Sequence, residues 1–447
     1  MYVTERFAKF AVNARAQALP AAVVHHAKRA VIDWHASVFP GFNTAPVQLL
    51  MQALAKDLDR GDAALSTGRK ASVRSAALIN GTAAHAAEVD DSFRDAMYHP
   101  GAATIAAALA VAQSCCASGD RFLRAVVMGY EISTRIGAVM GRAHYKFWHN
   151  TGTVGTFGAA AAAAELLQLD ERQFAHALAT AATFAAGLQQ AFRMDSMSKP
   201  LHPGRAAEGG VLAAQFAAQG ATGSLDIFEG EVGFGHALSD GPDWAGVADT
   251  LGHDFHITRL TFKNHIGCGH AFPAIDGVLA LQRRENLAAL NIAHVHVATY
   301  KPALDIACYG RPTSANEARF SIPYMVACAL VHGSVRMAAY EPDRLRDERV
   351  LGLLERVTVV VDPQIDADFP GKRAAHIEFT LHDGRRVSHL QPTRKGDPEA
   401  PLDDFELDSK LIELASPVIG EPAAQQLLQQ IWSLDRRADV WLGPLPR

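Results

Sequence analysis

The feature that most constrains this chain is a series of alanine-rich segments with helical spacing along residues 1–220. In residues 20–41 the apolar side chains recur at intervals of three and four, which places them on one face of a helix. Similar windows span 46–58, 70–87, 100–117, 121–141, 152–168, 171–187 and 205–219. Because small residues allow helices to approach closely, these windows predict a compact helical domain.

The pattern changes near residue 258, where short segments rich in β-branched residues begin. They span 292–300, 356–363, 376–384 and 385–390. Asp383-Gly384 separates the last two and signals a hairpin. Helical spacing intervenes at 269–285 and 317–332, so this part is predicted to be α+β.

Residues 403–434 have helical spacing again, after a polar and proline-containing connector. We therefore expect the tail to return to the first domain. The predicted organisation is a helical domain made of 1–262 with 403–447, and an α+β domain made of 263–402. The fold class is mainly α, with a large all-helical domain and a smaller α+β domain.

Composition excludes several classes of function. A formal net charge of -5 gives no general field for nucleic acid or for an anionic membrane surface. No segment has about 18 consecutive apolar residues, and the first residues do not form a signal peptide, so we expect a cytoplasmic protein. The five cysteines are odd in number and form no CxxC pair, which argues against disulfides and a structural zinc site.

The first candidate site is "DDSFRDAMYHPG", residues 90–101, which follows an apolar helical window and precedes another. Carboxylates upstream of His99 can orient its ring and shift its pKa toward neutrality, as proton transfer requires. An acidic helix cap with an exposed histidine would explain the same residues.

Two further candidates lie at predicted helix starts. Asn150 and Thr151 are good N-cap residues, and the helix start beside His149 could bind a carboxylate. A tightly packed core helix with an incidental histidine is the alternative. In "SKPLHPGRAAEGG", Lys199, His202 and Arg205 are three potential cations within seven residues, and a solvated basic turn is the alternative.

The region after residue 262 supplies the remaining candidates. "TFKNHIGCGH" carries Lys263 and a histidine and cysteine cluster whose spacing matches no structural zinc pattern, so no metal is expected. "EARFSIPY" carries Arg319 and Tyr324 beside an apolar run. A structural ion pair between Glu317 and Arg319 is the alternative there.

Together these motifs resemble the MmgE/PrpD family. The matching segments are "NGTAAHAAEVDDSF" with "HPGAA", "HNTGTVGTFGAAAAAAELLQLD", "SKPLHPGRAAEGGVLAA", "FKNHIGCGHAFPAID" and "EARFSIPYMVACAL". They follow the order of the family from about residue 70 to residue 330. Such a resemblance implies a large helical domain, a smaller α+β lid with the site between them, and a homodimer assembled through the helical domain.

The family includes 2-methylcitrate dehydratase, cis-aconitate decarboxylase and iminodisuccinate epimerase. The resemblance therefore implies an enzyme that makes or quenches a carbanion on a small polycarboxylate without a metal or an organic cofactor. It assigns catalytic roles and substrate-binding roles to two groups of residues. The catalytic group is His99, His149, Asp91 and Lys199, and the binding group is Glu88, Ser92, Lys263, Arg319 and Tyr324.

Three local departures bear on the substrate. The loop from Asp91 to His99 is shorter than in the methylcitrate dehydratases, Ser92 replaces the usual threonine, and Gly101 stands where the decarboxylases usually show serine. The expected function is a hydro-lyase similar to 2-methylcitrate dehydratase. An epimerase or a decarboxylase of the same family is the alternative, and a non-catalytic carboxylate-binding protein is the alternative of another class.

Overall fold

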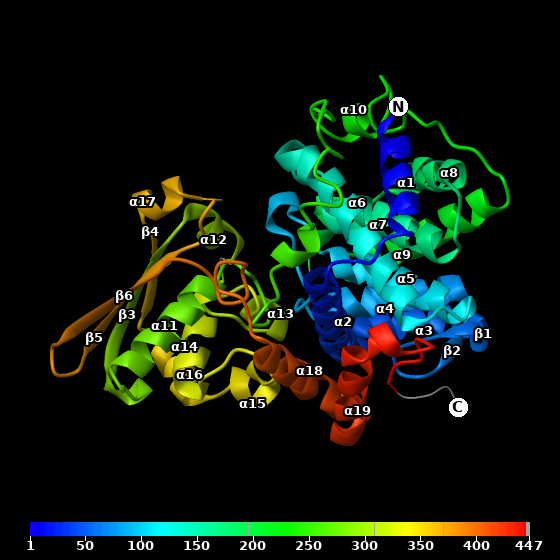
Figure 1. Cartoon of the computed structure of the whole chain (residues 1–447). Coiled ribbons are helices and arrows are strands. Elements are labelled where there is room, and N and C mark those ends of the chain that lie inside the picture. Colours follow the sequence, from blue (N-terminus) through cyan, green and yellow to red (C-terminus); the bar gives the residue numbers. More distant parts are fainter. Residues whose placement is uncertain (195, 308, 370, 444–447) are drawn as a thin grey trace. The chain divides into compact units, whose positions relative to one another are not determined.

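The computed structural model describes residues 1–194, 196–307, 309–369 and 371–443, and the chain divides into two compact units. The first unit comprises Met1–Phe262 with Asp403–Arg447, and the second comprises Lys263–Leu402. Within the described residues, no helix combines the length and the apolar character needed to cross a membrane. Figure 1 shows the elements of both units.

The first unit is built from helices. Its α-helices are α1 (Val3–Ala14), α2 (Ala21–Phe42), α3 (Ala45–Ala53), α4 (Val73–Ala86), α5 (Pro100–Ser114), α6 (Gly119–Tyr145), α7 (Asn150–Leu166), α8 (Glu171–Ala181), α9 (Leu201–Ala218), α10 (Phe234–Leu238), α18 (Asp404–Ile419) and α19 (Glu421–Trp432). The predicted helical windows are thus confirmed as helices, with ends that differ by several residues.

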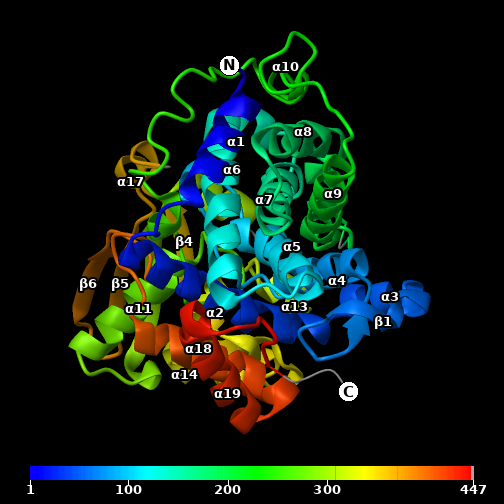
Figure 2. The ribbon, with the colours of Figure 1, turned by 45° about the vertical axis from the view of Figure 1, so that its right-hand side comes forward.

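Small residues bring the central helices together. Helix α7 packs against α5, α6 and α9, and Figures 1 and 2 show these helices gathered in the middle of the unit. A Cβ atom on Gly158 of α7 would lie 2.5 Å from Oγ1 of Thr104 on α5, and one on Gly210 of α9 would lie 2.5 Å from Cβ of Ala159. Larger side chains would therefore force these helices apart.

The first unit also contains a two-stranded antiparallel ladder that the sequence did not predict. Strand β1 (Leu58–Ala64) pairs with β2 (Lys70–Ala71), and helix α3 ends at Ala53 although the helical pattern continues to residue 58. Gly61 and Gly68 both have φ of +90°, a conformation that favours glycine. The backbone turns made by these glycines permit a strand ladder in a polar segment.

The second unit contains a four-stranded sheet with the order β4-β3-β5-β6. Its strands are β3 (Ile292–Thr299), β4 (Val357–Val361), β5 (Ala375–Leu381) and β6 (Arg386–Gln391). Strand β3 pairs in parallel with β4 and antiparallel with β5, and β5 pairs antiparallel with β6. Gly384, with φ of +85°, lies in the turn between β5 and β6, which confirms the predicted hairpin.

Helices of the second unit pack against this sheet and against each other. They are α11 (Phe272–Arg284), α12 (Lys301–Ile306), α13 (Ala315–Ala318), α14 (Ile322–His332), α15 (Pro342–Leu345), α16 (Glu348–Leu354) and α17 (Pro363–Ala367). Gly277 on α11 faces Ile377 on β5 so closely that a Cβ atom would lie 2.7 Å from Cγ1 of the isoleucine. This unit is therefore α+β, as predicted.

Candidate functional site

The connection between α4 and α5, residues 88–99, contains most of the predicted site residues of the first unit. We call it the site loop. It begins at Glu88, which has φ of +59° and so adopts a left-handed conformation that is uncommon outside glycine. Met97, near its end, has φ of +48°. Such conformations cost free energy and often occur at functional sites.

Asp91 fixes the first part of the site loop to the start of α5. One carboxyl oxygen accepts a hydrogen bond from the backbone N–H of Gly101 at 3.0 Å, and the other accepts one from the Tyr130 hydroxyl at 2.7 Å. Burial raises the pKa of Asp91 to about 8, and the neighbouring carboxylates of Asp33 and Asp90 act in the same direction, against both hydrogen bonds. A neutral carboxyl group can therefore exist here near pH 7.

Two histidines are oriented by the same loop. Nδ1 of His85 lies 2.7 Å from Oδ2 of Asp90, and Nδ1 of His99 lies 2.6 Å from the carbonyl oxygen of Asp91. In a neutral ring each bond places the proton on Nδ1 and makes Nε2 the basic nitrogen. The two rings lie 5.0 Å apart, with His85 fully buried and the His99 side chain 21% exposed. His99 thus offers a base that is partly accessible.

A second pair of histidines continues this row. His149 precedes α7, its ring lies 5.4 Å from that of His85, and its Nδ1 lies 3.0 Å from Nδ1 of His202. Burial lowers the pKa of His149 well below its usual value, and the charges of His85 and Lys199 add to this effect. Burial also lowers the pKa of His202 to about 4. His202, which the sequence presented as a potential cation, is thus neutral near pH 7.

Lys199 supplies positive charge at the same place. Its ammonium group forms an ion pair with Glu88 at the start of the site loop, and both side chains are about one fifth exposed, at 18% and 20%. The same ammonium lies 5.0 Å from the centre of the Phe192 ring, and Phe192 packs edge-on against His149. Arg205, by contrast, is exposed, as expected for the alternative of a solvated basic turn, and it pairs with Glu208.

The segment 254–261, just before the first stretch of this unit ends at Phe262, contacts the site loop. Ser92 and Thr261 exchange two backbone hydrogen bonds of 2.9 Å in an isolated bridge. Phe93 stacks on the His256 ring with the centres 5.0 Å apart. Ser92 is thus engaged through its backbone, and its predicted role in substrate binding stays a prediction.

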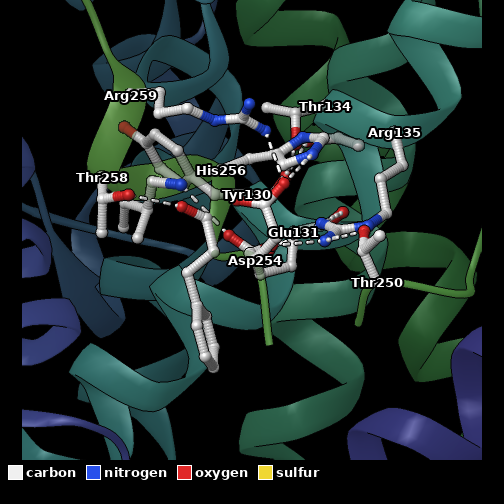
Figure 3. Close-up of polar contacts among 12 residues, drawn as sticks. Tyr130, Glu131, Thr134, Arg135, Thr250, Asp254, His256, Thr258 and Arg259 are labelled. Carbon is white, nitrogen blue, oxygen red and sulfur yellow. Dashed lines mark hydrogen bonds and ion pairs between the residues drawn. The ribbon is translucent and has the colours of Figure 1, made fainter. Parts of the chain in front are cut away.

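Helix α6 anchors that segment through a buried polar cluster, which Figure 3 shows. Arg135 pairs with Glu131 at 2.6 Å and donates to the carbonyl oxygen of Asp254 at 2.6 Å. Oγ1 of Thr134 lies 3.0 Å from Nδ1 of His256. Because Tyr130 lies in the same helix, α6 contacts the site loop directly through Asp91 and also anchors the segment that pairs with the loop.

Helix α18 also supports the site loop. Nζ of Lys410 lies 2.6 Å from Oδ1 of Asp33 and donates to the carbonyl oxygen of Val89 at 2.9 Å. Both charged side chains are buried, at 2% and 0% exposure. A buried pair of this kind has a specific geometry and loses several kcal/mol when one partner is removed, roughly 3 to 5.

The second unit places its candidates on the loop before α11. Lys263 is buried there, and Nε2 of His265 lies 2.8 Å from Oδ1 of Asp276. Nδ1 of His270 lies 3.0 Å from the Tyr300 hydroxyl instead. The two histidines of "HIGCGH" thus have separate partners within this unit.

Arg319 and Tyr324 have different surroundings. The carbonyl oxygen of Arg319 accepts a hydrogen bond from the backbone of Cys268 at 2.8 Å, and its guanidinium lies 5.2 Å from the centre of the Tyr340 ring. Tyr324 is fully buried in α14 and donates its hydroxyl hydrogen to the carbonyl of Ala339. The structure thus gives Tyr324 a packing role, and its predicted role in substrate binding stays a prediction.

Four residues of this site were not predicted as site residues: His85, Asp90, Tyr130 and His202. Asp90 and His202 lie inside candidate motifs of the sequence. Their place near a site could therefore be predicted, but their interaction partners could not. His85 and Tyr130 lie in apolar helical windows, where a single polar residue gives no signal of its own.

One group in the described part of the chain could place three donors around a metal ion. It consists of His85, Asp90 and His99, with one ligand atom from each lying within 4.8 Å of the others. Nδ1 of both histidines is, however, already within hydrogen-bonding distance of oxygen atoms of the site loop. The arrangement therefore fits histidines oriented for proton transfer at least as well as it fits a metal site.

Family models and known relatives match almost the whole chain. The family model described as the MmgE/PrpD N-terminal domain matches residues 5–246, and the MmgE/PrpD C-terminal domain matches residues 265–436. The cis-aconitate decarboxylase-like protein oryM of Aspergillus oryzae is 28% identical, over 98% of this chain and 95% of its own length.

Other relatives match different shares of this chain. The cis-aconitate decarboxylase of Mus musculus is 26% identical over 98% of this chain and 91% of its own length. The 2-methylcitrate dehydratase of Escherichia coli is 27% identical over 40% of this chain and 42% of its own length.

Proposed function

Because the chain belongs to the MmgE/PrpD family, we propose that it is a cofactor-independent lyase acting on a small di- or tricarboxylate through a carbanion-type intermediate. The observation that carries the proposal is the row of four histidine rings beside Lys199 in the first unit. Neighbouring rings in the row His99, His85, His149 and His202 lie 5.0, 5.4 and 5.2 Å apart.

These residues match the needs of carbanion chemistry. Removal of a proton from carbon requires a base with a pKa near neutrality, and a second group must protonate the leaving hydroxyl or the carbanion left by CO2. Nε2 of His99 is the proposed base, since its Nδ1 lies within hydrogen-bonding distance of the Asp91 carbonyl. His149 is the proposed second group, and Lys199 is the proposed partner of a substrate carboxylate.

The relatives support decarboxylation ahead of dehydration. Those that cover 98% of the chain are named cis-aconitate decarboxylases or proteins like them, whereas the 2-methylcitrate dehydratase of Escherichia coli covers 40%. This order reverses the expectation from sequence, which placed dehydration first. Both reactions need an acid and a cation that binds a carboxylate, so the proposed roles of His149 and Lys199 hold for either reaction. Dehydration also needs the base, His99.

The proposal also includes a homodimer, which the family resemblance implies. Light scattering on the purified protein would measure its mass, and a monomer at all concentrations would contradict the dimer.

Exchange of substrate hydrogen with solvent deuterium tests the proposed function. The protein is incubated in deuterium oxide with a panel of small polycarboxylates, and proton NMR follows both exchange and product. We expect exchange at a carbon next to a carboxylate, together with loss of CO2 or water or inversion of the centre. Binding of a polycarboxylate without exchange or product would instead indicate a carboxylate-binding protein.

A double variant distinguishes catalysis by this protein from catalysis by a contaminating enzyme. The double variant with His99→Asn and His149→Asn should bind the same polycarboxylate and show no exchange above background. Equal exchange by the double variant and the unmodified protein would show that these histidines do not perform the chemistry.

A further inference from the structure

His149 and His202 form a hydrogen bond between their two Nδ1 atoms. This bond restricts which tautomers the two rings can adopt. Their Nδ1 atoms lie 3.0 Å apart, so one of the two must carry a proton and the other must accept it. The rings come from different helices, since His149 precedes α7 and His202 lies in the first turn of α9. In neutral rings, one Nε2 is then a base and the other carries a proton.

The groups around the pair favour neutral rings. Burial is the main cause that lowers the pKa of both rings, and His85 and Lys199 lower both further. His99 acts on His149 in the same direction. Two neutral imidazoles joined by one hydrogen bond can exchange tautomers together without creating a buried charge.

Close backbone packing holds the second ring in place. Gly187 lies so near His202 that a Cβ atom on it would be 3.1 Å from Cγ of the ring, and its φ of +137° favours glycine. The carbonyl oxygen of Gly187 also accepts the backbone N–H of His149 at 2.8 Å. A Cβ atom on Gly152 would lie 3.0 Å from Cβ of His202. The residues around Gly187 thus fix both histidines at once.

The two rings differ in exposure. His149 is 3% exposed and has little access to water, whereas His202 is only partly buried. We propose that His202 connects the buried His149 to solvent, so that the two rings form a relay that moves protons between water and the substrate carbon. The relay rests on the proposed function, because the proton that it carries goes to the carbanion that the proposed reaction forms.

Each transfer in the relay is balanced. The electron pair that CO2 leaves on carbon takes the Nε2 proton of His149 and forms the new C–H bond. The Nδ1 proton of His202 passes to Nδ1 of His149, and Nε2 of His202 takes a proton from solvent. Both rings end neutral in the opposite tautomer.

The variant His202→Asn separates a relay from simple positioning. Its amide oxygen can accept the hydrogen bond from Nδ1 of His149, but the amide cannot pass a proton on. In deuterium oxide, we expect the unmodified protein to place solvent deuterium on the product carbon that carried the carbanion. We expect His202→Asn to bind the substrate normally and to form this deuterated product at least about 10-fold more slowly.

The matched control is Arg205→Gln, which changes an exposed residue in the same turn of α9. It should form the deuterated product at the unmodified rate. Formation of this product by His202→Asn at the rate of the control would overturn the relay, because a positioning role alone survives the substitution.

A spectroscopic readout does not depend on turnover. In the ligand-free protein with ¹⁵N-labelled histidine, assigned by comparison with His149→Asn and His202→Asn, we expect one ring protonated at Nδ1 and the other at Nε2. Protonation of both rings at Nε2 would overturn the relay alone, even if the protein turns over its substrate. Absence of exchange by the unmodified protein across the polycarboxylate panel would overturn the proposed function and the relay with it.

Discussion

The Tyr130 hydroxyl donates a hydrogen bond of 2.7 Å to Asp91, and thereby links helix α6 to the carboxyl group that caps α5. The pair is fully enclosed, since Tyr130 is 0% exposed and Asp91 is 3% exposed. Burial raises the pKa of Asp91 to about 8 although two hydrogen bonds favour its charged form. The protonation of Asp91 is therefore coupled to the stability of the first unit.

The first prediction concerns stability against pH. Between about pH 4 and pH 8 the folded protein keeps a proton on Asp91 that the unfolded chain has lost, so this group makes the free energy of unfolding fall as pH rises. Its stabilising contribution is complete below pH 4 and is lost as the pH passes 8. Asp91→Asn should remove this slope, which is at most about 1.4 kcal/mol per pH unit.

Urea unfolding at several pH values measures the difference. Asp95→Asn is the matched control, because it makes the same change on an exposed side chain of the site loop. Parallel stability curves for Asp91→Asn and the unmodified protein would contradict the prediction.

The second prediction concerns the base. His99→Asn keeps a donor that can reach the Asp91 carbonyl but removes the basic nitrogen, so the fold and ligand binding should persist. Turnover should fall roughly 100-fold or more, the scale for losing a positioned acid or base. Solvent-deuterium exchange is the measurement. Near-normal exchange in His99→Asn, with none in His149→Asn, would transfer the role of base to His149.

The third prediction concerns Lys199. Lys199→Met should weaken substrate binding by about 1.5 to 3 kcal/mol, because it removes a charge-assisted contact to a carboxylate. Isothermal titration with the exchanging polycarboxylate measures the change. Lys146→Met is a matched control, since its ammonium is exposed and also lies 5.0 Å from a phenylalanine ring. Equal affinities in both variants would remove Lys199 from the binding site.

The fourth prediction concerns Lys263, a residue of the second unit to which the family resemblance assigns a role in substrate binding. Lys263→Met should weaken binding by a similar amount, about 1.5 to 3 kcal/mol. Lys372→Met, an exposed change in the same unit, is the control. Circular dichroism must show that Lys263→Met is folded, because this lysine is buried. A folded variant with unchanged affinity would assign Lys263 a structural role.

The fifth prediction concerns metals. Exhaustive chelation should leave turnover unchanged, because the histidines of the site are oriented by oxygens of their own loop. Activity is measured before and after dialysis against a chelator. If turnover disappeared and one divalent ion restored it, the group of His85, Asp90 and His99 would be the metal site.

The fold could be predicted from the sequence where the local hydrophobic pattern agrees with the burial of the segment in the structure. Helices α5 and α7 are apolar on all sides and lie in the core, so their alanine-rich windows were sufficient. Strand β1 lies in a polar segment with no strand periodicity, and it exists because the turns at Gly61 and Gly68 allow it to pair with β2. Pairing of this kind is a tertiary property that no local window contains.

The site was predictable as motifs but not as contacts. His99 and His149 were singled out because each begins an apolar helix after a polar segment. The partner of His149, His202, is 53 residues away, and the partner of Asp91, Tyr130, is 39 residues away. Spacing within a motif cannot reveal such contacts, because they depend on how helices pack.

The hydrogen bond from Lys410 to the carbonyl of Val89 joins residues 321 positions apart. During translation the site loop emerges from the ribosome long before Lys410, which donates to the backbone of Val89, has been synthesised. During synthesis the nascent helical unit therefore lacks the contact between Asp33 and the Lys410 ammonium group until α18 emerges. The contact that holds the loop in its folded conformation is thus formed only by chains translated almost to completion, and a truncated product ending before α18 would be an early target for quality control.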